Sequence, residues 1–373
     1  SNGGLLEYSV VYTDRALNHM SEPFQQVMTD LHASLTKAYN ADHAVLVPGS
    51  GTYAMEAAAR AFCGDGERAL VVRNGYFSYR WSQILETLGK AEEEVTVMRA
   101  RPVLGNDDYL SGIRPPPADE VAARILDERP SMVAAPHVET SAGLILPEEY
   151  IATIAAAAKD VGAAFVLDGV ASGTAWVDLR KLGVDCYVTA PQKGWSGPAA
   201  VGVAMLSDRG LELAASRKPT SFAVDLAKWY DVMRAYLNGG HMYHTTMPTD
   251  AIRAFRDVVF ETEDFGLARA QDECWRLGFG VRDALDERGF RSVAAPGFEA
   301  PGVAVVYAPP DASFAPKFKH AGLQIAAGVP LMIGEDNDTF NTFRIGLFGL
   351  DKLRNVDLTV QNFKAALNNV LNQ

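Results

Sequence analysis

Short apolar runs alternate with segments of helical periodicity along the first 206 residues of the chain. Helical patterns, such as those over 22–40 and 147–160, separate the runs. Continuous apolar strands separated by helices are typical of a parallel sheet whose two faces are covered by helices. The sequence therefore predicts an α/β fold with a mainly parallel, doubly wound sheet. Its strands are expected at residues 44–47, 69–72, 94–98, 132–136, 163–167, 186–188 and 200–206.

From about Phe265 the pattern changes. A long amphipathic helix is expected over 267–288, and it leads to shorter alternating strands and a final helix. A chain of 373 residues also exceeds what one hydrophobic core usually serves. We therefore expect a smaller α+β domain at the C-terminal end. The expected parts are an N-terminal arm over residues 1–15, a large domain over 16–262 and a small domain over 263–373.

Charge and composition disfavour several classes of partner. The chain has 46 acidic and 34 basic residues, and a net charge of −12 argues against nucleic acid or an anionic membrane as the main partner. No apolar run approaches the roughly 20 residues of a membrane helix, and the first residues lack the features of a signal peptide. Cys63, Cys186 and Cys274 are far apart, so neither disulfides nor a metal site is expected, and we expect a cytoplasmic protein.

Two polar residues follow buried strands near the middle of the chain. Asp168 comes directly after the run 163–167, and Lys193 follows the run 186–188 in a glycine- and proline-rich loop. Ligands of open α/β sheets gather at the carboxyl ends of the strands. The acid and the lysine are therefore suitably placed to hold two ends of a flat aromatic cofactor. The alternatives are an exposed loop lysine and an acid that caps a turn.

The stretch 163–197, AAFVLDGVASGTAWVDLRKLGVDCYVTAPQKGWSG, resembles the class V aminotransferases of pyridoxal phosphate fold type I. That group includes alanine–glyoxylate and serine–pyruvate aminotransferases. The resemblance implies pyridoxal 5′-phosphate (PLP) as the cofactor, with Lys193 bound to it covalently and Asp168 paired with its pyridinium nitrogen. An enclosed lysine has the lowered pKa that this chemistry needs. A carboxylate at the ring nitrogen keeps the cofactor an electron sink.

The turn PGSGT at 48–52 joins an expected strand to an expected helix. Ser50, Gly51 and Thr52 can present amides and hydroxyls at the positive end of that helix, which favours an anion. Glycine turns before helices are common, so the pattern alone is weak. The resemblance implies that this turn binds the cofactor's phosphate and that Gln192 donates to the same group.

Two further motifs resemble family segments around the cofactor ring. In NGYFSYRW, residues 74–81, the register favours Phe77 as the aromatic residue that stacks on the ring. Tyr76 is a near alternative, and a packing role in the core is the simpler one. In HVETSAG, residues 137–143, the resemblance implies that Thr140 faces the phenolic oxygen, and His137 is expected to be structural.

The loop HMYHTTMPTD, residues 241–250, resembles a family loop that crosses a dimer interface to the partner's phosphate. Tyr243 and Thr246 match in register, which implies a homodimer with shared active sites. The alternative is a polar loop before a helix, with Thr249 or Asp250 as the cap.

The motif FRIGLFG, residues 343–349, carries an arginine inside an apolar strand, where an unpaired charge is costly. The resemblance implies that Arg344 binds the substrate carboxylate, which the planar guanidinium suits. An interdomain salt bridge is the alternative. Family members usually begin with a proline- and glycine-rich segment, whereas this chain has VVYTDRALNHM, so Tyr12 or Arg15 could contact the substrate.

The sequence predicts a PLP-dependent, ping-pong transamination between a small amino donor of the alanine or serine type and glyoxylate or pyruvate. A 2-aminoethylphosphonate–pyruvate aminotransferase is the close alternative, because the GSGT turn also suits that subgroup. A desulfurase or lyase is disfavoured, since Gln192 stands where desulfurases carry histidine and Cys274 lies in a helical pattern. A non-enzymatic role is disfavoured because Lys193 and Arg344 are both present.

Overall fold

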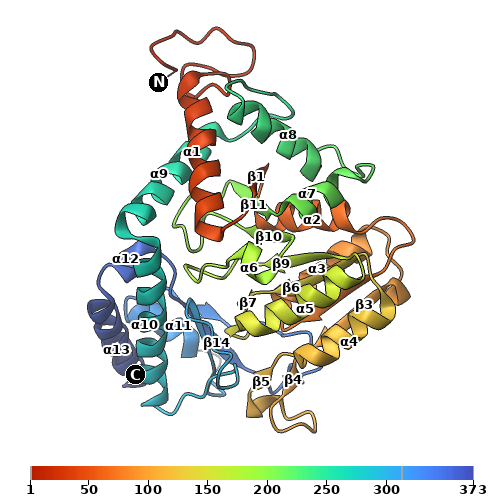
Figure 1. Ribbon diagram of the computed structural model, residues 1–373. Helices are drawn as coiled ribbons and strands as arrows, with labels where there is room; N and C mark the ends of the chain where they lie inside the picture. Colours follow the sequence, from red (N-terminus) through yellow and green to blue (C-terminus); the bar gives the residue numbers. More distant parts are fainter. Residues whose placement is uncertain (1, 312–313, 373) are drawn as a thin grey trace.

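The computed structural model describes residues 2–311 and 314–372. Its centre is a seven-stranded sheet in the order β1-β11-β10-β9-β6-β2-β3 (Figure 1). Strand β11 runs antiparallel to both of its neighbours, and the other pairings are parallel, so the predicted mainly parallel sheet is confirmed. The strands are β1 His43–Pro48, β2 Ala69–Arg73, β3 Val95–Arg99, β6 Met132–Pro136, β9 Ala164–Asp168, β10 Cys186–Thr189 and β11 Val201–Leu206.

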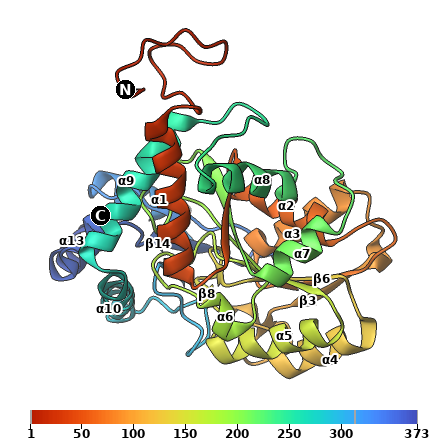
Figure 2. The ribbon, with the colours of Figure 1, turned by 45° about the horizontal axis from the view of Figure 1, so that its top comes forward.

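Helices cover both faces of this sheet. Helices α4 and α5 pack together on one face, and α2 packs against α3, α7 and α8 on the other (Figure 2). The inner strands β2, β6, β9, β10 and β11 are buried along their whole length, which explains their continuous apolar runs. The helices of this part are α1 Glu22–Tyr39, α2 Gly51–Phe62, α3 Tyr76–Thr87, α4 Ala118–Glu128, α5 Glu148–Asp160, α6 Leu179–Leu182, α7 Asp208–Ala215, α8 Leu226–Leu237 and α9 Thr249–Phe265.

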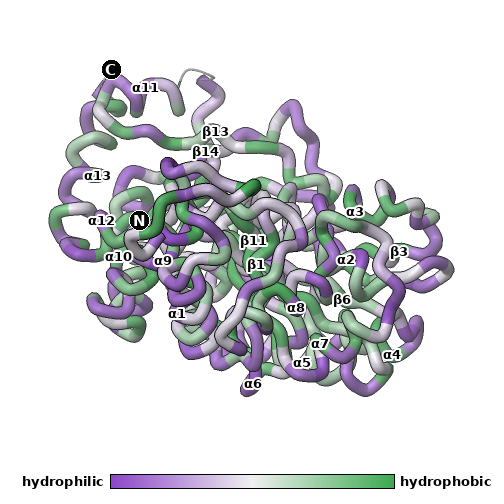
Figure 3. The backbone as a smooth tube through the Cα atoms, turned by 90° about the horizontal axis from the view of Figure 1, so that it is seen from above, coloured by the Kyte–Doolittle hydropathy of each residue, from purple (hydrophilic) through white to green (hydrophobic). Residues whose placement is uncertain are grey.

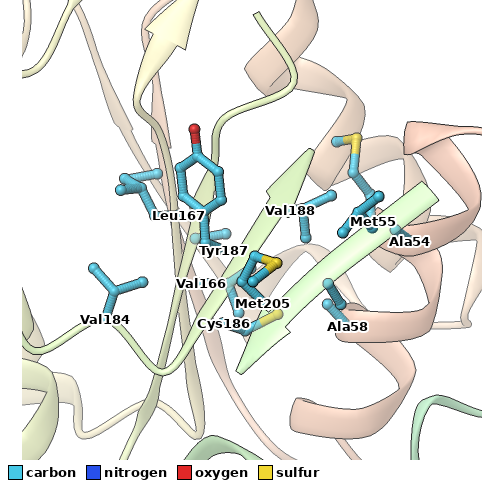
Figure 4. Packing of buried hydrophobic residues seen from close by; sticks show 14 of the residues in the cluster. Ala54, Met55, Ala58, Val166, Leu167, Val184, Cys186, Tyr187, Val188 and Met205 are labelled. Atoms are coloured by element: carbon cyan, nitrogen blue, oxygen red, sulfur yellow. The ribbon is translucent and has the colours of Figure 1, made fainter. Parts of the chain in front are cut away.

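Apolar segments of the chain gather at the central strands, whereas the surrounding helices and loops are mostly polar (Figure 3). One side of this core fixes the position of α2. Its residues Ala54, Met55 and Ala58 face Val188 of β10 and Met205 of β11 (Figure 4). The start of α2 is therefore held rigidly beside the carboxyl end of β10.

The C-terminal part is the expected smaller α+β unit. Its three strands form an antiparallel sheet in the order β12-β14-β13. A second hydrophobic cluster, which includes Leu277, Phe318, Phe343 and Phe363, packs α10 and α13 against this sheet. The elements are α10 Leu267–Asp286, β12 Val303–Tyr307, α11 Phe314–His320, β13 Ala326–Ala327, β14 Thr342–Gly346, α12 Leu350–Leu353 and α13 Val356–Leu371.

Several elements were not predicted from the sequence. Two segments that were expected to be loops each contain a pair of short antiparallel strands. Two short 3-10 helices were also not predicted. Helix α9 continues past residue 262 and ends at Phe265, so the expected domain boundary falls inside a helix. The short pieces are η1 Glu92–Glu94, β4 Arg101–Pro102, η2 Tyr109–Ser111, β5 Ile113–Arg114, β7 Val138–Glu139 and β8 Leu144–Ile145. Within the described residues, no helix combines the length and apolarity needed to span a membrane.

Candidate active site

A cavity of about 200 Å³ lies at the carboxyl end of the central strands. It is formed by the starts of α2 and α3, the ends of β6 and β9, and the loop after β10. Eight of the predicted site residues line it: Ser50, Gly51, Thr52, Phe77, Thr140, Asp168, Gln192 and Lys193. These residues span more than 140 positions of the sequence, and they meet because the carboxyl ends of the strands lie at one edge of the sheet.

Asp168 ends β9 and is 7% exposed. Its Oδ2 accepts a hydrogen bond from the Trp81 indole nitrogen at 3.2 Å, and its Oδ1 accepts one from the Val170 amide at 3.1 Å. Burial raises the pKa of Asp168 to about 6, although these two bonds oppose the rise. A nearby cation would stabilise the ionised form of this acid.

Lys193 lies in the loop after β10 and is partly buried. Its Nζ is 5.4 Å from the centre of the Phe348 ring. Burial, and then the charge of Arg344, lower the pKa of Lys193. The following residue must be glycine, because a Cβ on Gly194 would come within 2.2 Å of the Gly173 carbonyl oxygen. The loop is thus pressed against the chain after β9, which holds the lysine near Asp168.

The start of α2 faces the same cavity. Ser50 is the N-cap residue, but its side chain makes no capping hydrogen bond. A Cβ on Gly51 would lie 2.9 Å from Val170, so only glycine lets the helix approach the loop after β9 this closely. The first-turn amides and the Ser50 and Thr52 hydroxyls therefore form a positive, donor-rich wall that suits an anion.

Phe77 lies in the first turn of α3, and the turn is fixed by Glu139, which the sequence interpretation overlooked. The Glu139 carboxylate is fully buried and accepts five hydrogen bonds. The donors are the amides of Phe77, Ser78 and Ser141 and the hydroxyls of Ser78 and Ser141. The sequence did offer one signal for Glu139: it is an acid next to Thr140, in a short strand that is buried. Tyr76, the alternative to Phe77, contacts the Phe77 ring edge-on and does not line the cavity.

Arg344 lies on β14 at the edge of this site. Its guanidinium carbon is 5.8 Å from the centre of the Phe77 ring, and its Nε donates to the Ala327 carbonyl at 2.9 Å. The side chain is half-buried, which lowers its pKa. It does not line the 200 Å³ cavity itself. Over residues 2–311 and 314–372 it forms no ion pair, so the expected alternative of a salt bridge is not observed.

Tyr243 and Thr246 do not line the cavity of their own chain. Tyr243 is 52% exposed, and its hydroxyl is 3.0 Å from that of Thr246. Tyr12 and Arg15 are also outside the cavity. The Tyr12 hydroxyl donates to the Met247 carbonyl at 2.9 Å, and Arg15 is exposed in the N-terminal arm.

His137, which the sequence interpretation expected to be structural, lies in the interior of the fold. It is buried, its Nδ1 is 2.7 Å from the Ser172 hydroxyl, and burial lowers its pKa to about 4. The three cysteines are buried and free; Cys274 packs inside α10 and is not presented to the cavity. No group of three His, Cys, Asp or Glu side chains in the described part of the chain could hold a metal ion.

Comparison with known proteins establishes the family. The sequence model of the family described as aminotransferase class-V matches residues 5–306. The chain belongs to this family. Class V aminotransferases use PLP and move an amino group between amino compounds and oxo acids. The cavity described above is therefore the candidate active site of a PLP-dependent enzyme.

Two kinds of relative extend this result. A 2-aminoethylphosphonate–pyruvate transaminase of Paraburkholderia phymatum is 31% identical over 342 residues, which cover 90% of this chain and 84% of the relative. An alanine–glyoxylate aminotransferase of Nostoc sp. has a TM-score of 0.78 at 20% identity, covering 94% of this chain and 89% of its own. A ureidoglycine–glyoxylate aminotransferase of Bacillus subtilis has a TM-score of 0.79 at 20% identity, covering 97% and 88%. The two structures share the PLP fold type I with this chain.

Proposed function

We propose that the 200 Å³ cavity binds PLP and that the chain uses it to transfer an amino group from 2-aminoethylphosphonate to pyruvate. The observation that carries the cofactor site is the meeting of an uncapped helix start, a buried acid and a partly buried lysine in one cavity. These groups fit the phosphate, the ring nitrogen and the aldehyde of PLP. When bound, the cofactor supplies a carbonyl for the amine and a ring that withdraws electrons.

Each end of the cofactor has a matching part of the chain. At the phosphate end, the α2 start offers backbone amides, and its helix dipole favours the negative charge. At the ring nitrogen, the positive charge of the ring would keep Asp168 ionised. This charge would offset the effect of burial, which raises the pKa of Asp168. Residues assigned to the phosphate are Ser50, Gly51, Thr52 and Gln192; Phe77 is assigned to the ring face and Thr140 to the phenolic oxygen.

Lys193 would hold the cofactor and then move the proton. Its pKa is lowered by burial and by the charge of Arg344, so a larger fraction of the amine is neutral near pH 7. A neutral amine at this position could accept the proton from the substrate Cα and hold it for return later in the reaction. Arg344, which forms no ion pair among the described residues and lies 5.8 Å from the Phe77 ring, would bind the carboxylate of pyruvate.

The curated relatives favour the phosphonate donor over the alanine or serine donor that the sequence alone favoured. Their 31% identity extends over most of both chains, whereas the glyoxylate enzymes are 20% identical and share the fold alone. We therefore place 2-aminoethylphosphonate first among donors and pyruvate first among acceptors.

The active site is proposed to be shared in a homodimer. Tyr243 and Thr246 do not line the cavity of their own chain, and both are exposed, as expected of residues that reach a second subunit. The N-terminal arm adjoins this loop through the bond from Tyr12 to Met247. It also exposes Leu5, Leu6, Tyr8 and Val10, an apolar surface that a partner subunit would cover.

A donor screen tests the proposal. The purified protein with PLP should be yellow, and 2-aminoethylphosphonate should bleach the visible band faster than alanine, serine or aspartate does. Pyruvate should restore the band faster than glyoxylate. Lys193→Ala should abolish both changes, and Arg344→Ala should raise the pyruvate concentration needed by about tenfold or more. Bleaching by alanine or serine but not by the phosphonate would contradict the proposed donor.

A further inference from the structure

We propose that Arg80 is a further ligand of the cofactor's phosphate group, and this rests on the proposed PLP site. Arg80 lies on α3, three residues after Phe77, so the two side chains share one face of the helix. Both line the 200 Å³ cavity. The Arg80 guanidinium carbon is 5.5 Å from the centre of the Phe77 ring. The side chain therefore lies over the ring and extends toward the start of α2.

Arg80 already contacts the phosphate wall of the cavity. Its Nη1 donates a hydrogen bond to the Thr52 hydroxyl oxygen at 3.2 Å. A hydroxyl that accepts in this way keeps its own proton free for another acceptor. That proton and the α2 amides would be directed at one anion, with the guanidinium beside them. A phosphate oxygen is the acceptor that suits all three donors.

The charge of Arg80 acts on Asp168, where it helps to oppose the rise in pKa that burial causes, but the two side chains form no ion pair. No carboxylate of residues 2–311 and 314–372 forms an ion pair with Arg80, whereas Arg60, on the neighbouring α2, pairs with Glu56 at 2.8 Å. Among the described residues that line the cavity, only Arg80 and Lys193 carry a positive charge. Lys193 is assigned to the aldehyde end of the cofactor. Arg80 is thus the one lining cation left to neutralise a phosphate dianion at the other end.

The test compares two ligands that differ only in the phosphate. Dissociation constants of PLP and of pyridoxal are measured for the cofactor-free protein by absorbance titration. Arg80→Ala should weaken PLP binding about 10- to 100-fold, as expected for losing a hydrogen bond to a charged group. Pyridoxal binding should change by less than about threefold, because pyridoxal has no phosphate for the arginine to bind.

Two further variants complete the test. Arg80→Lys keeps the charge and should recover part of the PLP affinity, and it also serves if Arg80→Ala fails to fold. Arg234, an exposed residue of α8 that pairs with Asp231 at 2.7 Å, gives the matched control, and Arg234→Ala should leave both affinities unchanged.

Three results would overturn the proposal. Unchanged PLP affinity in Arg80→Ala would remove Arg80 from the phosphate site, and a higher KM for 2-aminoethylphosphonate alone would assign the residue to the substrate. An equal loss for PLP and pyridoxal would show that Arg80 only supports the fold around Phe77. A wild-type protein that binds neither ligand would instead refute the proposed PLP site, so the two failures are distinguishable.

Discussion

Helices α2 and α3 begin at the same cavity, but the partial positive charge at their N-terminal ends is balanced in different ways. Both follow a strand of the large sheet, and both start at the same cavity. At α3, the buried Glu139 carboxylate accepts the amides of Phe77 and Ser78 at 3.1 and 2.9 Å. At α2, the Ser50 side chain makes no capping bond. One helix start is satisfied by a carboxylate of the chain, and the other has no side-chain cap, which is why we propose that the phosphate of PLP binds there.

The largest expected effect comes from removing the internal anion. Glu139→Ala should lower the free energy of unfolding of the cofactor-free protein by about 3–5 kcal/mol, because buried donors are left without an acceptor and each costs about 1–3 kcal/mol. Denaturant unfolding measures this change. Glu139→Gln keeps the shape and one acceptor oxygen, so it should lose less. A loss below about 1 kcal/mol in Glu139→Ala would contradict the view that this carboxylate fixes the start of α3.

The two buried acids of the site differ in the number of hydrogen bonds that they accept. Glu139 accepts five hydrogen bonds, whereas Asp168 accepts two and has its pKa raised from 3.8 to about 6 by burial. The folded chain therefore binds more protons at Asp168 than the unfolded chain does between these values. Its contribution to stability is lost as pH rises through this window, by about 3 kcal/mol at pH 7.

Asp168→Asn has no such titration. The free energy of unfolding of the variant minus that of the wild type, both cofactor-free, should increase by about 2.4 kcal/mol between pH 4 and pH 7. The difference between the two proteins is the quantity to measure, since buried His137, with its pKa lowered to about 4, gives the opposite pH dependence in both. A difference that stays constant with pH would show that Asp168 is not an uncompensated buried acid.

Local signals in the sequence were sufficient for the part of the site that lies on the sheet edge. Asp168 ends one buried strand, Lys193 follows another, and the PGSGT turn leads into a helix. Because the carboxyl ends of parallel strands meet at one edge, order along the chain predicts proximity in space. The direction of β11 had no such signal, since an apolar run looks the same whichever way it runs.

Contacts between distant segments could not be read from the sequence. Glu139 accepts amides from a helix 62 and 61 positions earlier in the chain, and Arg80 reaches a hydroxyl 28 positions before it. A helix start after the 241–250 loop was expected only as an alternative, with Thr249 or Asp250 as the cap, and the extent of α9 was not predicted although Ile252, Phe255 and Val259 recur at helical spacing. Both missed site residues lie inside motifs that were recognised for a neighbouring residue.

The smallest expected effect on stability is also the most specific for the comparison of helix starts. Ser50→Ala should change the free energy of unfolding of the cofactor-free protein by less than about 0.5 kcal/mol, because its hydroxyl caps nothing in its own chain. It should weaken PLP binding about tenfold and leave pyridoxal binding unchanged. Ser21→Ala is the matched control: Ser21 accepts from the Phe24 amide at the start of α1, so it should lose about 1 kcal/mol of stability without affecting PLP. If the two variants lose equal stability, Ser50 is an ordinary helix cap and the contrast between α2 and α3 does not hold.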